Sequence, residues 1–161
     1  MVETPHSDPD DFEDPLSNFE PAEYPSELHK VLAEEPSGSI QATPCPKVEA
    51  DTSVREATAM LHGLKVSSLL VVEDEKLVGI FTERDVLEKA AEAYPTMADH
   101  PVSDVMTSDP LVVYESDPVG TAVAAIAVAG HRHVPVLNFN GTIAGIVSPK
   151  RVLRCLSTHL D

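Results

Sequence analysis

The sequence predicts an α+β fold in which two βαββα repeats pack as a pseudo-twofold pair. Residues 51–54 (DTSV) align with residues 116–119 (SDPV) at an offset of 65, which becomes 66 after one inserted residue near Asp74. Each copy opens with apolar residues at helical spacing and continues with two short apolar segments joined by a turn. A single unit of about 55 residues leaves one face of a small sheet uncovered, so we expect the two copies to share a core.

A helix is predicted at the start of each repeat. In the first copy, Ser53 and Glu56 match a capping box, and apolar residues recur at helical spacing after it. In the second copy, Pro118 favours a helix start and the same apolar face follows. Gly63 and Gly130 are expected to end the two helices, because glycine reaches positive φ most easily.

Two strands and a second helix are predicted to follow in each copy. The strands span residues 69–72, 77–81, 134–137 and 142–147. The pair Asn140 and Gly141 is typical of the turn in a hairpin, and Thr82 and Ser148 stand where the second helices begin. Shorter strands are expected ahead of each unit, near residues 46–49 and 111–114.

Acidic residues dominate the composition. The chain has 161 residues, with 27 Asp and Glu against 11 Lys and Arg, for a formal net charge of −16. Such a surface repels a phosphate backbone, which excludes sequence-independent nucleic-acid binding. Residues 1–36 hold 11 of the acidic residues and one base. We therefore expect an acidic, Pro-rich and partly disordered extension over residues 1–36, a first repeat over 37–97 and a second over 98–161.

One short helix is predicted inside this extension. Ser26 is a suitable N-cap, Leu28, Val31 and Leu32 share a face, and Pro36 closes the segment. The pattern fits a solvated, frayed turn, and it also fits a helix that docks on the body or on a dimer mate. The residues alone leave these alternatives open.

The sequence also bears on the cellular compartment. No apolar stretch approaches the roughly 20 residues that span a membrane, and the N-terminus lacks the basic and apolar segments of a secretory signal. Cys45 and Cys155 lie far apart and form no CxxC pair, which favours reduced thiols. We expect a cytoplasmic protein that does not contact a membrane.

Four motifs, found in order along the duplicated body, carry a family resemblance. Residues 102–107 read VSDVMT, residues 132–136 read RHVPV, and the strand-to-helix turns read GIFTERDV at 79–86 and GIVSPKRV at 145–152. Over about residues 37–160 the chain resembles a tandem pair of CBS domains, the arrangement called a Bateman module. The resemblance implies a non-catalytic regulatory module that binds AMP, ADP, ATP or S-adenosylmethionine and assembles as a disc-shaped homodimer.

Thr82 and Asp85 are the first candidate ligand-binding residues. A hydroxyl and a carboxylate at a helix start suit a phosphate and a sugar diol, because free N–H groups attract anions and a carboxylate accepts from two hydroxyls. The resemblance implies that Asp85 binds the ribose hydroxyls and that Thr82 contacts the ribose or a phosphate. The same Thr-x-x-Asp spacing is also a capping box in which nothing binds, and spacing alone leaves that alternative open.

The equivalent turn of the second copy carries Ser148 and Arg151. A guanidinium only donates hydrogen bonds, so two charge-assisted bonds to ribose, at roughly 1.5 to 3 kcal/mol each, are lost there. That loss weakens ribose binding by about two powers of ten or more. We expect one competent adenosine site per chain, at Asp85, and a degenerate cleft at Ser148 and Arg151.

The resemblance also implies positions for the base and the phosphates. These candidates are Ile80, Pro110, Leu111 and Val112 for adenine, and Arg132 and His133 for the phosphates. An ordinary buried strand and a solvated turn are the respective alternatives. A metal at His131 and His133 is not expected, because a zinc site needs three or four ligands.

Two functional hypotheses follow. In the first, the chain is a ligand sensor that acts through an unknown effector protein, with adenine nucleotides slightly favoured as ligands. In the second, it is a constitutive homodimerisation scaffold without a ligand, whose acidic extension recruits a basic partner. An enzyme is not expected, since the sequence has neither a G-x-S-x-G motif nor a P-loop, and no cofactor is required.

Overall fold

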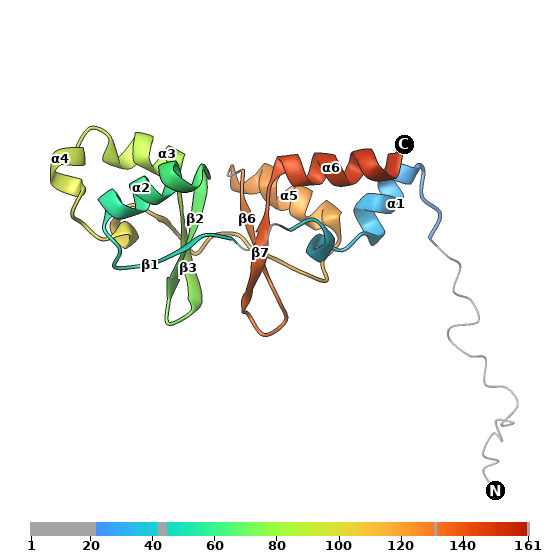
Figure 1. The fold of residues 1–161 in the computed structure, drawn as a ribbon. Coiled ribbons are helices and arrows are strands. Elements are labelled where there is room, and N and C mark those ends of the chain that lie inside the picture. The colour runs from blue at the N-terminus through green and yellow to red at the C-terminus, as the bar shows by residue number, and fades with distance from the viewer. Residues whose placement is uncertain (1–21, 42–44, 131, 161) are drawn as a thin grey trace, which may run out of the picture.

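The computed structural model describes residues 22–41, 45–130 and 132–160, which form two sheets with helices beside them (Figure 1). The first sheet has the order β1 (Lys47–Glu49), β2 (Ser68–Glu73), β3 (Lys76–Thr82), β4 (Thr107–Ser108). The second has the order β5 (Val113–Tyr114), β6 (Val134–Leu137), β7 (Ile143–Val147). In each sheet the first strand pairs in parallel with the second, and the second pairs antiparallel with the third. The predicted α+β fold of two βαββα repeats is confirmed.

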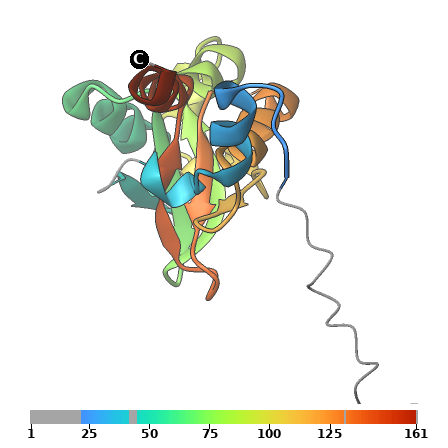
Figure 2. The same ribbon diagram turned by 90° about the vertical axis from the view of Figure 1, so that its right-hand side faces the viewer.

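The helices lie together on one side of the molecule, and the hairpin turns of β2–β3 and β6–β7 lie on the other (Figures 1 and 2). The helices are α1 (Glu27–Glu34), α2 (Val54–Leu64), α3 (Glu83–Asp85), α4 (Tyr94–Met97), α5 (Val119–Ala129) and α6 (Pro149–Leu160). A π-helical turn, η3 (Val86–Ala90), follows α3, and the 3-10 turns are η2 (Ser37–Ser39) and η4 (Val102–Asp104). The predicted strand at 111–114 is shorter than expected and begins only at Val113.

The start of α2 agrees with the sequence, but its end does not. The capping box forms, with the Ser53 hydroxyl accepting from the Glu56 N–H. The prediction that Gly63 ends the helix is wrong, because Lys65 is the residue with positive φ (53°). Val66 donates its N–H to the carbonyl of Leu61 at 3.1 Å and packs in the same core, which fixes the end two residues later. Gly130 ends α5 at φ 63°, as predicted.

Backbone hydrogen bonds show the pseudo-twofold relation between the repeats. The N–H of Val102 donates to the carbonyl of Thr52, and the N–H of Ser37, 65 residues earlier, donates to the carbonyl of Asp117, both at 2.7 Å. Each segment that precedes a repeat therefore closes the other repeat. Irregularities in strand pairing also match, since both sheets shift register at equivalent places in β2 and β6.

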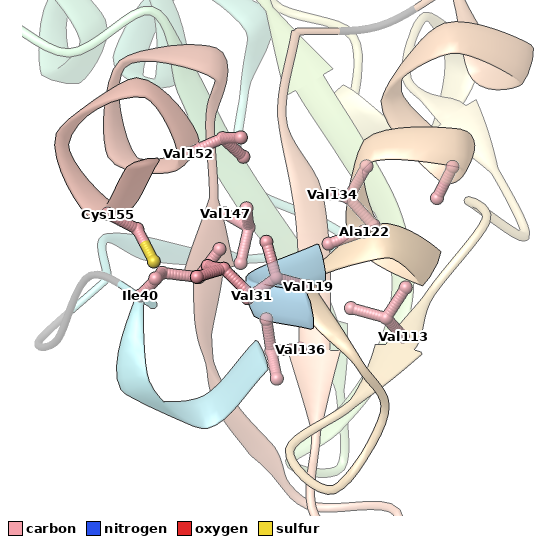
Figure 3. Packing of buried hydrophobic residues seen from close by; sticks show 11 residues of the cluster. Val31, Ile40, Val113, Val119, Ala122, Val134, Val136, Val147, Val152 and Cys155 are labelled. Carbon is pink, nitrogen blue, oxygen red and sulfur yellow. The ribbon is translucent and has the colours of Figure 1, made fainter. Parts of the chain in front are cut away.

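The second repeat is completed by the segment around α1. Val31 is buried in the core of that repeat, and Figure 3 shows it among side chains from α5, β6 and β7. Glu35 accepts a 2.7 Å hydrogen bond from the Val119 N–H, and a Cβ on Gly120 would lie 2.8 Å from the Leu32 carbonyl oxygen. Of the alternatives for this helix, docking on the body is the one that the structure shows; residues 1–21 lie outside the described part.

Candidate functional site

A cavity of about 340 Å³ opens between the repeats. Its first wall comes from the turn at the end of β3, and its second from the segment between α5 and β6. The lining residues are Ser67, Thr82, Glu83, Arg84, Leu87, Glu88, Gly130, Arg132 and His133. Thr82 is thus brought close to Arg132 and His133, two other predicted ligand contacts that lie about 50 residues later in the chain. The volume is in the range of sites for small ligands and cofactors.

Arg84 bridges the two walls of this cavity. Its Nη1 donates to the Gly130 carbonyl oxygen at 3.0 Å, and its Nε lies 3.4 Å from Oε1 of Glu88. One carbonyl and one carboxylate thus hold a guanidinium group that lines the cavity. Arg84 belongs to the turn at residues 79–86, but its contact with the second repeat is a tertiary feature with no local signal in the sequence.

The surroundings of His133 favour the neutral form of its imidazole. Burial lowers the pKa of its imidazole below the ordinary value, the charge of Arg132 lowers it further, and Glu83 acts in the opposite direction. Nε2 of the imidazole lies 3.4 Å from the Ser67 hydroxyl oxygen. In its neutral form the imidazole can still hydrogen-bond to a ligand, and the guanidinium groups of Arg132 and Arg84 add positive charge to the lining of the cavity. His131 lies outside the described residues.

Asp85 is the last residue of the short helix α3; it is buried and is not among the residues that line the cavity. Its carboxylate Oδ2 accepts from both the N–H and the hydroxyl of Thr82, each at 2.8 Å, and its own N–H donates back to that hydroxyl at 3.2 Å. The other oxygen, Oδ1, is 2.7 Å from Nζ of Lys89 and 3.4 Å from the Thr107 hydroxyl. The capping box is therefore formed, and the role of Asp85 toward ribose stays a prediction.

The residues predicted to face adenine are not gathered at one place. Ile80 is fully buried with Leu70 and Ile146 in the small cluster between the repeats. Pro110 and Val112 line a second cavity of about 380 Å³ next to the hairpin turns, with Lys76, Leu77, Asp109, Leu137, Asn140 and Gly141. Leu111 is 47% exposed, so the alternative of an ordinary buried strand does not describe it. The adenine position stays a prediction.

The second turn differs from the first in its hydrogen bonding. Ser148 accepts hydrogen bonds through its carbonyl from the N–H groups of Arg151 (2.9 Å) and Val152 (3.1 Å), and α6 then runs as a regular helix. Arg151 is half-buried and has no carboxylate with which to close a capping box. Residues 42–44, which the repeat equates with residues 107–109, lie outside the described part.

Two residues that sequence reasoning missed are Lys89 and Thr107. Lys89 stands four residues after Asp85, which is ion-pair spacing on a helix, so this signal was present in the sequence. Thr107 belongs to β4, which pairs with β3 at Ile80 and so approaches Asp85. That approach depends on sheet pairing, which the local sequence does not encode.

Metal binding and membrane insertion receive no support from the described residues. Within residues 22–41, 45–130 and 132–160, no group of three or more His, Cys, Asp or Glu side chains is placed to hold a metal ion. In the same ranges no helix is long and apolar enough to cross a bilayer. Cys45 and Cys155 are both free thiols, and burial raises the pKa of each.

Comparison with known proteins identifies relatives of both the sequence and the fold. The sequence model of the CBS domain matches twice, at residues 38–92 and 102–158. An uncharacterized 17.7 kDa protein of Acidianus ambivalens is 32% identical over 118 residues, covering 73% of this chain and 70% of its own length. Inosine-5'-monophosphate dehydrogenase of Nitrosopumilus maritimus is 29% identical over 131 residues, which are 78% of this chain but only 25% of that enzyme.

Among solved structures, CBSX2 of Arabidopsis thaliana superimposes with a TM-score of 0.68 at 26% identity, covering 78% of this chain and 98% of its own. That structure holds AMP.

Proposed function

The chain belongs to the CBS domain family, and we propose that it is a non-catalytic regulatory module that binds an adenosine-containing ligand between its two repeats. The ligand class is AMP, ADP or ATP, with S-adenosylmethionine as the other candidate. The module acts in the cytoplasm through an effector protein. A ligand that contacts both repeats favours one relative arrangement of them, which is how occupancy can change what the effector meets.

The cavity between the repeats is the observation that carries this proposal. It joins Thr82 of one repeat to Arg132 and His133 of the other, so a single ligand there touches both. Arg132 and Arg84 supply positive charge in a chain whose net charge is −16, and this local reversal favours an anionic group such as a phosphate. The complex of CBSX2 with AMP supports adenine nucleotides.

One competent site per chain is proposed, on the side that carries Asp85. Its counterpart Arg151 cannot accept from a ribose diol, so the cleft at Ser148 and Arg151 is degenerate. Adenine is proposed to reach toward Ile80 and the segment 110–112. In this arrangement Asp85 must exchange at least one of its present donors for a ribose hydroxyl.

A second candidate, a constitutive homodimerisation scaffold, is favoured by exposed apolar side chains on the helical side. Leu87 and Leu153 occupy equivalent positions, 66 residues apart, and are 72% and 66% exposed. Two leucines at symmetric places on one side suit contact with a second copy of the chain. We propose a homodimer through this side in either case, and only the ligand separates the two functions.

A thermal-shift titration separates the candidates. A ligand that binds only the folded state raises the melting temperature as its concentration increases. At 100 times its Kd it adds about 2.7 kcal/mol to the free energy of unfolding. We expect this rise with AMP or ATP, and Arg132→Ala should weaken AMP binding more than adenosine binding, because the arginine faces the phosphate. Arg154→Ala, on the exposed side of α6, is the matched control. If AMP, ATP and S-adenosylmethionine at millimolar concentration all leave the transition unmoved, the scaffold is the better account.

A further inference from the structure

The Asp85 carboxylate has no accepting capacity left. A carboxylate offers about four lone-pair sites, and four donors occupy them. Oδ2 accepts from the N–H and the hydroxyl of Thr82, and Oδ1 accepts from Nζ of Lys89 and from the Thr107 hydroxyl. The Asp85 side chain is only 4% exposed. A sugar diol can bind this carboxylate only by displacing one of these donors.

The four donors differ in how easily they can leave. The Thr82 N–H is the buried N-cap donor of α3 and bonds to Asp85 Oδ2, so loss of this bond would leave a buried donor unpaired. The Thr107 contact is long, at 3.4 Å, so it is easily lost, but its loss frees only one of the two acceptor positions that the two hydroxyls of a diol need. Lys89 makes the shortest contact, 2.7 Å, yet its side chain is 41% exposed. Water can therefore solvate the ammonium once it moves away.

Lys89 also reaches the connection between the two repeats. Its ammonium donates to the carbonyl oxygens of Val105 at 2.9 Å and Met106 at 3.4 Å, just before β4. One charged group thus ties Asp85 in the first repeat to the segment that leads into the second. Removal of Lys89 from Asp85 weakens that tie at the same time.

We propose that Lys89 is an internal competitor for the ribose diol and sets both the affinity and the ligand class of the site; this rests on the proposed function. Only a ligand with vicinal hydroxyls replaces the hydrogen bond that the Asp85 carboxylate loses when the ammonium leaves. A 2'-deoxyribose ligand offers one hydroxyl fewer and displaces Lys89 poorly. Binding of a ribose ligand frees the Val105 and Met106 carbonyls, which couples occupancy to the connection between repeats.

Calorimetric titration of Lys89 variants with AMP and with 2'-deoxy-AMP tests this proposal. Lys89→Met should tighten AMP roughly tenfold, about the worth of one charge-assisted hydrogen bond, and should change 2'-deoxy-AMP much less. Lys89→Gln removes the charge but can still donate to the Val105 carbonyl oxygen. This second variant is expected to fold even if Lys89→Met does not. Lys30→Met is the matched control, since Lys30 is also a half-exposed helical lysine paired with a carboxylate, Glu27. Unchanged or weaker AMP binding in a folded Lys89 variant overturns the proposal.

A measurement on the wild-type protein gives the same information without a variant. Pulsed acetylation, read by mass spectrometry, reports how freely each lysine reacts. Saturating AMP should raise the acetylation rate of Lys89 several-fold and leave that of Lys30 unchanged. If Lys89 labelling stays constant or falls while AMP is bound, the competitor role is refuted but adenosine binding stands. If the wild-type protein binds none of AMP, ATP and S-adenosylmethionine, the proposed function fails and the competitor role fails with it.

Discussion

Replacement of Gly120 by alanine tests how the segment around α1 completes the second repeat. Alanine in a helix is ordinarily more stable than glycine by about 1 kcal/mol. Here the new Cβ would lie 2.8 Å from the carbonyl oxygen of Leu32, so the backbone of α1 must move away. That movement threatens the burial of Val31, worth about 1.5 to 3 kcal/mol, and the hydrogen bond from Val119 to Glu35, worth about 1 kcal/mol.

The two effects have opposite signs, and the contact with Leu32 should dominate. We expect Gly120→Ala to lower the free energy of unfolding by about 1 to 3 kcal/mol, measured by urea titration and accompanied by faster proteolysis within α1. Gly63→Ala is the matched control, because Gly63 is also helical but has no atom within 4 Å of an added Cβ. It should raise stability by about 0.5 to 1 kcal/mol. The reasoning is refuted if both variants are stabilised alike.

Three further predictions concern the site and the helical side. Thr82→Ala should cost about 1 to 2 kcal/mol in urea unfolding, since the capping box is lost; an unchanged midpoint would contradict the geometry at Asp85. The lowered pKa of His133 means that the folded protein binds fewer protons than the unfolded chain. The stability that the buried, neutral His133 contributes is therefore lost as pH falls below about 6.5. In thermal melts below that pH, His133→Gln should lose less stability than the wild-type protein. Leu87→Glu together with Leu153→Glu should convert a dimer into monomers in size-exclusion light scattering, and a monomeric wild type would rule out that face.

The duplication is the part of the fold that the sequence predicts best. Helical spacing after Ser53 and Pro118, and the apolar segments that follow, place the strands within one or two residues because a repeat supplies each signal twice. The predicted end of α2 is wrong because Gly63 is only a local signal. The observed end depends on the packing of Val66 against the core, which is a property of the whole fold. The predicted strand at 111–114 is too long for a similar reason. Residues 111–112 belong to the segment that runs from β4 in one sheet to β5 in the other.

The candidate site was predictable in its parts but not in its assembly. The spacing of Thr82 and Asp85 is that of the capping box that forms, and the predicted phosphate candidates Arg132 and His133 both line the cavity. The separation of Pro110 and Val112 into another cavity depends on the path of the connection between the repeats. The carbonyl partners of Lys89 are likewise long-range contacts, so no local pattern reveals that Asp85 is saturated.

Native mass spectrometry of the wild-type protein with AMP measures how many ligands one chain holds, because it counts ligands and chains in one spectrum. We expect one AMP for each chain. Two AMP molecules bound equally well to each chain would contradict the inequality between Asp85 and Arg151. A spectrum with no bound AMP at millimolar concentration would contradict adenine-nucleotide binding itself.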